Sequence, residues 1–207
     1  MDFIRQKYLS LCQTPSDIFE HLPILCKYAS DCESVLELGV RGCVSSWAFL
    51  YGLLLNEKSK KILLLNDLIP CDIQEILTSA KQTNVHIDYC WANDLDINVS
   101  IPIDLTFIDT WHVYGQLKRE LEKFAVITRK YIIMHDTTVD AIDGESIRLG
   151  YNIHQQSIET GWDREEIETG LWKAVEEFLG SHPEWSLHQR YVNNNGLTIL
   201  KRKEADV

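Results

Sequence analysis

The chain lacks the features that would tie it to nucleic acid or to a membrane. Its 20 lysine and arginine residues are outnumbered by 31 acidic residues, which gives a net charge of −11 and a pI near 5.0. No cluster of lysine and arginine offers a footprint for phosphate groups, so neither nucleic acid nor an anionic membrane is an expected partner. No apolar run approaches the length that spans a bilayer.

Paired cysteines and targeting signals are also lacking. Six cysteines are scattered through the first half of the chain without any Cys-x-x-Cys pair, namely Cys12, Cys26, Cys32, Cys43, Cys71 and Cys90. This usage predicts small buried residues in a reducing compartment, and neither a disulfide framework nor a zinc site. The opening MDFIRQKY has no apolar core of a signal peptide, so a cytoplasmic protein is expected.

Two common glycine motifs for phosphate binding are absent. The dinucleotide motif needs Gly-x-Gly-x-x-Gly, and the phosphate loop needs Gly-Lys-Ser/Thr before its helix. The stretch VLELGVRGCVSSWAFL has Gly39 and Gly42 three residues apart and no lysine. Glu37 precedes this turn, where a carboxylate would repel a pyrophosphate. It would suit a cofactor that carries positive charge, such as the ammonium and sulfonium groups of S-adenosylmethionine.

What the sequence does have is an alternation of short apolar runs and helical patterns. Strands are expected at Ser34–Leu38, Ile62–Asn66, Val85–Cys90, Leu105–Ile108 and Tyr131–Met134. Helices are expected at Ser45–Leu55, Asp72–Gln82 and Val113–Phe124. Short apolar strands that alternate with helices predict a parallel sheet covered on both faces.

The two ends of the chain depart from this alternation. Before the first strand, residues 1–32 are expected to form extra N-terminal helices, one of them starting at Thr14-Pro15 and restarting or kinking at Pro23. After a helix at Leu171–Leu179, an Asn/Gly-rich link joins strands at Ser186–Tyr191 and Leu197–Leu200 and predicts an antiparallel hairpin. With no linker or repeat, residues 1–207 are expected to form a single domain.

Residues 137–170 show no clear periodicity. A segment this long inside a compact domain is usually a lid or a binding loop, so we expect it to cover the substrate. It contains Trp162 and an acidic group for which a solvated helix start is the favoured interpretation: Asp163, Glu165, Glu166 and Glu168.

Polar residues end two of the expected strands. Asp67 follows the second strand, where a carboxylate can accept both ribose hydroxyls of an adenosine. Asn93 and Asp94 follow the third strand and mark the expected neighbourhood of the adenine. Trp91, just before them, could stack on a base or simply pack, and the sequence leaves both open.

These motifs resemble those of a known family. VLELGVRGCVSS resembles the first motif of class I S-adenosylmethionine-dependent methyltransferases. Four further stretches resemble the branch that contains cephalosporin-hydroxylase-like and macrocin or sugar O-methyltransferases: DLTFIDTWHVYGQLKRELEKF, YIIMHDT, GLWKAVEEFLGSHPEW and NNNGLTILKR. The resemblance covers roughly Ser16 to Arg202. It implies an α/β, Rossmann-like, seven-stranded and mainly parallel sheet with S-adenosyl-L-methionine as cofactor.

The resemblance also implies the site residues. Cofactor contacts are expected from Glu37, Gly39, Gly42, Ser45, Asp67, Asn93, Asp94 and Asp109. The chain departs from the branch at Asp109-Thr110-Trp111-His112, where relatives often have Asp-Gly before an acidic or small residue and His. This places a bulky Trp111 beside the site. The other departure, Thr128-Arg129-Lys130 in place of Gly-Gly, is expected to alter only a turn.

A metal site is expected at the ends of the fourth and fifth strands. The resemblance implies a divalent ion held by Asp109, His135 and Asp136, with Mg²⁺ or Mn²⁺ suited to the oxygen ligands and Mn²⁺ or a softer ion favoured by the imidazole. Other interpretations remain open. Asp109 could cap the following helix, and His135 could be a core histidine with a satisfied hydrogen bond.

His112 is the expected general base, acting with Asp109 as the catalytic pair. An imidazole with an ordinary pKa near about 6.5 can accept a proton at neutral pH. The Asp-x-x-His spacing after a strand places His112 on the first turn of the next helix, at the rim of the site. The alternative is a histidine at a helix start that faces solvent.

The sequence therefore predicts an S-adenosylmethionine-dependent O-methyltransferase acting on a small hydroxylated acceptor. A sugar or nucleotide-sugar is preferred from the branch resemblance alone. One alternative is a non-catalytic adenosyl-cofactor binding subunit. Another is a hydroxylase, although the chain lacks a His-x-Asp…His iron motif. Whether the protein forms a homo-oligomer is left open.

Overall fold

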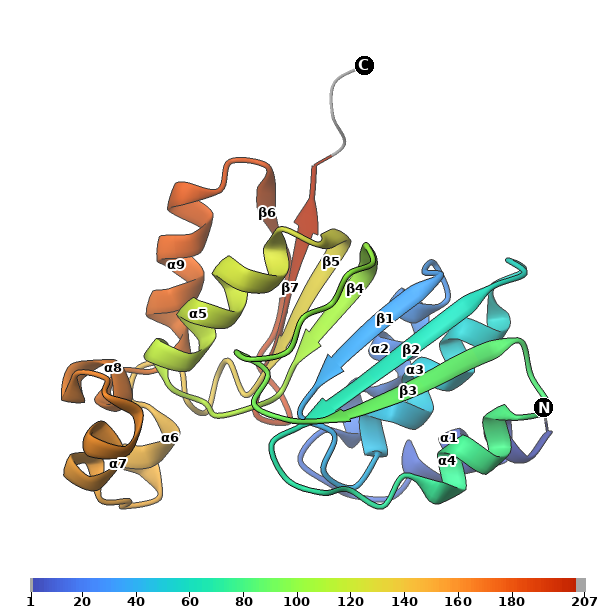
Figure 1. Ribbon diagram of the computed structural model, residues 1–207, viewed down its shortest axis with the longest axis horizontal. Helices are drawn as coiled ribbons and strands as arrows, with labels where there is room; N and C mark the ends of the chain where they lie inside the picture. Colours follow the sequence, from blue (N-terminus) through green and yellow to red (C-terminus); the bar gives the residue numbers. More distant parts are fainter. Residues whose placement is uncertain (1, 204–207) are drawn as a thin grey trace.

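The computed structural model describes residues 2–203, which form a seven-stranded sheet with helices on both faces (Figure 1). The strand order is β3-β2-β1-β4-β5-β7-β6. The strands are β1 (Ser34–Leu38), β2 (Lys61–Asp67), β3 (Val85–Trp91), β4 (Ile103–Ile108), β5 (Thr128–His135), β6 (Trp185–Tyr191) and β7 (Leu197–Arg202). β1 to β5 pair in parallel, whereas β7 is antiparallel to both β5 and β6. The predicted sheet and its C-terminal hairpin are confirmed.

The side chains of the central strand alternate between two cores. Val35 belongs to the cluster formed with the N-terminal helices, and Leu36 and Leu38 belong to the cluster under the later helices. This is the period of two that a strand buried on both faces requires. The first cluster includes residues of α1 (Asp2–Leu11), α2 (Leu22–Ala29), α3 (Val44–Leu55) and α4 (Gln74–Ala80), and the second those of α5 (Tyr114–Ala125) and α9 (Leu171–Ser181).

The expected helix start at Thr14-Pro15 is wrong. No helix begins there: the Thr14 hydroxyl donates to the Ser10 carbonyl and closes the end of α1. The chain then makes a 3₁₀ turn, η1 (Phe19–His21), and α2 begins at Leu22 with Pro23 in its first turn. A proline is tolerated there because the first N–H groups of a helix have no intrahelical partner.

Residues 137–170 contain three short helices rather than an irregular loop. They are α6 (Glu145–Arg148), α7 (Ile153–Thr160) and α8 (Arg164–Glu168), grouped beside the start of α5 and α9 (Figure 1). Each is too short to show a hydrophobic period. Ile153 and Ile167 pack with Val113 in a small core, with Trp111 and Trp162 against it. Asp163 is the N-cap residue of α8 and Glu165 and Glu166 lie in its first turn, whereas Glu168 is its last residue.

Only three of the six cysteines are buried, whereas all six were expected to be. All six are free thiols; Cys26, Cys32 and Cys43 are buried, whereas Cys90 is exposed. Among residues 2–203, no helix is long and apolar enough to cross a membrane.

The topology brings the polar strand ends together. The carboxyl ends of β1, β2, β4 and β5 lie at the same edge of the sheet, because these strands are parallel and adjacent. The strand order reverses between β1 and β4, and ligands bind in the crevice that such a reversal leaves in open α/β sheets.

Candidate active site

The glycine turn after β1 depends on Gly39. Its φ of +87° lies in the left-handed region, and a Cβ on it would meet the carbonyl oxygen of Asp109 at 2.0 Å. Only glycine allows this close approach of the turn to the end of β4. Gly42 differs, because a Cβ there would have no atom within 4 Å.

A cavity of about 390 Å³ opens beside this turn. It lies in the size range of about 300–1,000 Å³ that is typical of ligand sites. Its lining comprises Gly39, Arg41, Asn66, Asp67, Leu68, Asn93, Asp94, Asp109, Thr110, Trp111, Gln116, Thr160 and Trp162. Five predicted cofactor residues are therefore present: Gly39, Asp67, Asn93, Asp94 and Asp109. The other three, Glu37, Gly42 and Ser45, do not line the cavity.

Glu37 lies inside the protein and not at the mouth of the turn. Its side chain is completely buried, and the Ser45 hydroxyl donates to its Oε1 atom. In β1 it shares the parity of Val35, so it faces the core beneath α3. Burial raises the pKa of Glu37 to about 8, because a charged carboxylate loses its hydration there. Glu37 is therefore mostly neutral at pH 7.

Asp67 fixes the backbone of the glycine turn. Its Oδ2 atom accepts from the N–H groups of Val40 (2.8 Å) and Arg41 (2.9 Å), and its Oδ1 atom accepts from that of Ile69 (2.9 Å). Burial alone would raise the pKa of Asp67, but these hydrogen bonds outweigh it and lower the pKa. A carboxylate has about four acceptor positions, so one is left for a ligand hydroxyl.

Asp94 is linked to a second buried acid that the sequence reasoning missed. The Gln116 amide donates to the Asp94 carboxylate (3.0 and 3.2 Å) and to Glu120 Oε1 (2.8 Å). Burial and the nearby charge of Asp94 raise the pKa of Glu120 well above its ordinary value, which favours the protonated form of this carboxyl. Because the Gln116 nitrogen faces both acids, this network holds its amide in one orientation beside the cavity.

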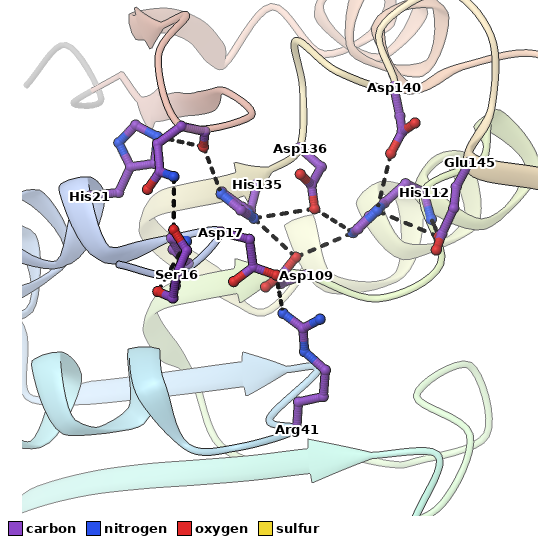
Figure 2. A network of polar contacts seen from close by, with 12 residues as sticks. Ser16, Asp17, His21, Arg41, Asp109, His112, His135, Asp136, Asp140 and Glu145 are labelled. Carbon is purple, nitrogen blue, oxygen red and sulfur yellow. Dashed lines mark hydrogen bonds and ion pairs between the residues drawn. The ribbon is translucent and has the colours of Figure 1, made fainter. Parts of the chain in front are cut away.

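Two aspartates and two histidines converge where β4 and β5 end (Figure 2). The Nε2 atom of His112 lies 3.2 Å from Oδ1 of Asp109 and 3.2 Å from Oδ2 of Asp136. The Nδ1 atom of His135 lies 3.3 Å from each of the same two oxygens. All four side chains are largely buried.

The charges in this network stabilise one another. Burial alone would raise the pKa of Asp109, but the positive charge of His135 and hydrogen bonds from both imidazoles hold it well below its ordinary value. Burial alone would lower the pKa of His135, but the charge of Asp109 and hydrogen bonds to Asp109 and Asp136 raise it to about 10. The pKa of His112 is likewise well above 6.5, against the effect of burial, through its contacts with Asp109, Asp140 and Asp136.

The far nitrogen of each imidazole also has a neighbour (Figure 2). His112 Nδ1 lies 3.3 Å from Oδ2 of Asp140 and 3.5 Å from Oε2 of Glu145. His135 Nε2 lies 3.2 Å from the carbonyl oxygen of Asn194, in the turn between β6 and β7. Neighbours of this kind orient histidines and select their tautomer, as they do in metal sites.

The donor set fits a divalent cation. One donor atom each from Asp109, His112 and Asp136 lie within 4.8 Å of one another. Asp136 adopts a positive φ of 55°, which is strained for an aspartate, and its buried Oδ1 atom has no hydrogen-bond partner among the described residues. Of the predicted ligands, Asp109 and Asp136 are in this set. His135 faces the same two oxygens, and His112 joins them.

Two local alternatives from the sequence, for Asp109 and for His112, are decided by these contacts. α5 begins at Tyr114 with Val113 as its N-cap residue, so Asp109 does not cap a helix. His112 precedes the helix and is not in its first turn as expected; it is largely buried and does not face solvent. Trp91 is 64% exposed, donates to the Leu68 carbonyl and does not line the cavity.

Several cavity and network residues were not among the predicted site residues. They are Arg41, Asn66, Thr110, Gln116, Asp140, Glu145, Thr160 and Asn194, together with Trp162 in its cavity position. Asp140, Glu145, Thr160 and Trp162 lie outside every motif quoted above, so no local spacing could reveal them. The other five lie inside or beside those motifs, where their contacts could not be read from the sequence. Arg41 was within the glycine motif, where its pairing with Asp17 across the site could not be foreseen (Figure 2).

The chain is similar to known proteins in its structure, whereas the sequence comparisons found no match. No family model matches the chain, and no curated protein sequence matches it. An O-methyltransferase from Bacillus cereus in complex with SAH has a TM-score of 0.55 at 14% identity, over 98% of this chain and 90% of that one. The SAH-bound methyltransferase PaMTH1 from Podospora anserina has a TM-score of 0.57 at 13% identity, over 99% and 89%.

The N-methyltransferase NodS from Bradyrhizobium japonicum, in complex with S-adenosyl-L-homocysteine (SAH), has a TM-score of 0.56 at 12% identity, over 96% and 99%. These likenesses establish the fold: the chain has the class I methyltransferase fold that its motifs resemble. The neighbours include both an O- and an N-methyltransferase, so the fold does not select the acceptor atom.

Proposed function

We propose that the protein is an S-adenosylmethionine-dependent O-methyltransferase that acts on a small hydroxylated acceptor. The observation that carries the proposal is the cavity at the strand-order reversal of this fold, with three carboxylates in its wall: Asp67, Asp94 and Asp109. Arg41 is the only cationic side chain in the described lining, and it is paired with Asp17. Such a wall favours a cationic cofactor over a pyrophosphate.

We assign each binding residue to a different part of the cofactor. Gly39 lets the backbone approach it closely, Asp67 offers one remaining acceptor position to a ribose hydroxyl, and Asp94 lies at the nucleoside end. Glu37, Gly42 and Ser45 are not part of this proposal as direct contacts. Glu37 and Ser45 support the turn from inside the protein.

The acceptor centre is proposed at Asp109, Asp136, His112 and His135. Of these, Asp109, Asp136 and His135 would hold a divalent cation, Mg²⁺ or Mn²⁺, with the imidazole favouring Mn²⁺, and His112 is the proposed base. When bound, the cation would polarise the acceptor hydroxyl and compensate the charge of the two aspartates. Against the effect of burial, these aspartates raise the pKa of His112 well above its ordinary value and so favour the imidazolium, which cannot accept a proton. His112 can serve as the base only when that charge is compensated.

The nature of the acceptor rests on the sequence resemblance. A sugar or nucleotide-sugar remains the proposed class, since the branch with macrocin and sugar O-methyltransferases is the one that the motifs resemble. A second candidate, hydroxylation, gains support from the structure, because two histidines and a carboxylate form the ligand set of many iron oxygenases. The third candidate is a cofactor-binding subunit without catalysis.

Product analysis separates the three candidates. Purified protein is incubated with S-adenosylmethionine carrying a labelled methyl group, with Mn²⁺ and with a panel of sugars and sugar nucleotides, and the products are identified by mass spectrometry. Transfer of one labelled methyl group to oxygen is the expected result. Addition of an oxygen atom without the label, in a parallel incubation that supplies Fe²⁺, O₂ and a reducing co-substrate, would indicate a hydroxylase. Cofactor binding with no modified acceptor in either incubation would indicate the non-catalytic subunit.

A further inference from the structure

The turn between β6 and β7 connects the N-terminal part of the chain to the acceptor centre. The carbonyl oxygen of Asn194 in this turn lies 3.2 Å from Nε2 of His135 and 3.2 Å from Nε2 of His21 (Figure 2). The same nitrogen of His21 lies 2.9 Å from the carbonyl oxygen of Asn193. The two imidazole rings are 5.7 Å apart, with an angle of 74° between their planes. Two histidines that are distant in the sequence therefore share one carbonyl oxygen.

This carbonyl group decides which nitrogen of His135 always carries a proton. A carbonyl oxygen only accepts hydrogen bonds, so Nε2 of His135 must be the donor. In the neutral ring, Nδ1 then carries the lone pair, and it faces Oδ1 of Asp109 and Oδ2 of Asp136 at 3.3 Å from each. Three electron-pair donors converge on one point. That point needs a cation, which is a proton in the imidazolium form and a divalent ion when one is bound.

The turn has a backbone that its neighbours must hold in place. Asn194 and Asn195 have positive φ angles of 43° and 69°, which residues with a Cβ rarely adopt. The side chain of Asn194 donates to the carbonyl oxygen of Ser16 (3.0 Å) and accepts from the backbone N–H of Glu20 (3.1 Å). On the other side, the carbonyl oxygen of Asn195 accepts from the N–H groups of residues 138 and 139 (2.9 and 3.0 Å).

His21 makes hydrogen bonds only with this turn. It ends η1, its side chain is completely buried, and its Nδ1 atom has no hydrogen-bond partner among the described residues. Burial of an unpaired polar atom costs free energy, so a position used only for packing would favour an apolar side chain. The polar contacts of the ring all come from Nε2, and both of them fix the carbonyl groups of the turn.

We propose that His21 is a positioning residue of the acceptor centre, which acts through Asn194 to keep a proton on Nε2 of His135 and to direct Nδ1 to a divalent cation. This rests on the proposed function. It gives residues 16–21 a role in the site, whereas the sequence alone suggested only extra helices. The ligand class is a hard divalent cation such as Mg²⁺ or Mn²⁺, because two of the three donors are carboxylate oxygens.

Three variants test the path from His21 to His135. His21→Ala removes both hydrogen bonds from the ring to the turn, whereas His21→Gln retains an N–H donor near the position of Nε2. Asn194→Gly removes the side-chain bonds to Ser16 and Glu20 and keeps the backbone carbonyl. Glycine adopts positive φ angles readily, so this variant should fold even if His21→Ala does not.

Tyr28→Phe is a matched control. Tyr28 lies on α2, the helix that follows His21, and its hydroxyl donates to Gln189 on β6 at 3.5 Å. The change therefore removes a polar contact between the N-terminal helices and the same hairpin, but it leaves the turn at Asn194 untouched.

The first test is Mn²⁺ binding, followed by electron paramagnetic resonance. Removal of a group that orients a metal ligand usually weakens metal binding by about 10–100-fold. We expect this loss for His21→Ala and Asn194→Gly, and less than about 5-fold change for His21→Gln and Tyr28→Phe. S-adenosylhomocysteine affinity should stay close to wild type in all four, because neither His21 nor Asn194 lines the cavity. Wild-type-like Mn²⁺ affinity in folded His21→Ala or Asn194→Gly, or an equal loss in Tyr28→Phe, would overturn the inference.

A second test needs no metal and separates this inference from the proposed function. Nuclear magnetic resonance should show a slowly exchanging Nε2 proton of His135 in the wild-type protein, identified by its loss in His135→Asn. The resonance should persist in His21→Gln and Tyr28→Phe and should be lost through fast exchange in His21→Ala and Asn194→Gly. An unchanged resonance in the last two would refute the positioning role. Absence of Mn²⁺ binding to the wild-type protein would instead overturn the metal centre of the proposed function.

Discussion

Asp140 lies behind His112: its Oδ2 atom is 3.3 Å from Nδ1 of the imidazole, whereas Asp109 and Asp136 face Nε2 on the other side (Figure 2). Asp140 is itself fully buried and accepts two hydrogen bonds from Arg148 (2.6 and 2.8 Å). A carboxylate in this position favours a proton on Nδ1 and directs Nε2 toward the aspartates. This orientation suits either a metal ligand or an oriented base, and the two uses give different predictions.

The metal proposal predicts dependence on a divalent ion. Turnover should be abolished by excess chelator and restored by Mg²⁺ or Mn²⁺, and Asp136→Asn should lose turnover while S-adenosylhomocysteine still binds. Mn²⁺ binding, followed by electron paramagnetic resonance, should be lost in the same variant but kept in Asp143→Asn, a change at an exposed residue. Full turnover in excess chelator would rule out the metal.

Removal of the His112 side chain should slow methyl transfer. His112→Ala is expected to lower the rate by about 10²–10⁴-fold, the usual contribution of a positioned proton acceptor. The exposed His154 provides a control, and His154→Ala should retain the wild-type rate. Thermal unfolding and S-adenosylhomocysteine titration of both variants separate a chemical effect from a loss of structure. Wild-type turnover by His112→Ala would remove this residue from the catalytic centre.

Asp67→Ala should weaken binding of S-adenosylhomocysteine by about 1.5–3 kcal/mol, the scale for hydrogen bonds to a charged group. The variant loses one ribose acceptor and also frees the backbone N–H groups of Val40, Arg41 and Ile69. Calorimetry measures the affinity, with Asp88→Ala as the control because the Asp88 side chain is exposed on β3. Tighter binding of NAD than of either adenosyl compound would contradict the cofactor assignment.

The two glycines of the turn should respond differently to alanine. Gly39→Ala forces a left-handed residue to carry a Cβ and sets that atom 2.0 Å from the Asp109 carbonyl oxygen. We expect a loss of more than about 2 kcal/mol in stability, together with loss of cofactor binding. Gly42→Ala has open space and should change little. Denaturant unfolding and cofactor titration measure both; equal effects of the two changes would contradict this account of the turn.

Glu37 gives a prediction about pH. Burial raises its pKa from 4.5 to about 8, so between these values the unfolded chain releases a proton that the folded protein retains. The stabilising contribution of Glu37 is therefore lost as the pH rises through this range. Glu37→Gln cannot ionise, and its midpoint of thermal unfolding relative to wild type should be higher at pH 9 than at pH 5. S-adenosylhomocysteine affinity should be unchanged, because Glu37 does not line the cavity.

The sequence alone was enough to predict the sheet and the polar residues at the ends of its strands. Gly39, Asp67 and Asp109 stand at the carboxyl ends of three apolar runs that form parallel strands. Neighbouring parallel strands have their carboxyl ends at the same edge of the sheet. That rule brings these residues to a common cavity without further information. The Asn/Gly-rich link before Leu197 likewise defined the antiparallel hairpin through its turn chemistry alone.

The tertiary structure decided which way the side chains face and what lies behind them. Glu37 was expected at the mouth of the turn, but its side chain lies in the core on the same face of the sheet as Val35. Its place in the sequence, just before the turn, does not tell which face of the sheet its side chain takes. Asp140 reaches His112, and Trp162 reaches the cavity, through packing of α6 to α8 on α5, helices too short to leave a hydrophobic period. A local pattern specifies an element, whereas contacts between distant elements depend on how their buried faces fit together, and no spacing along the chain encodes that fit.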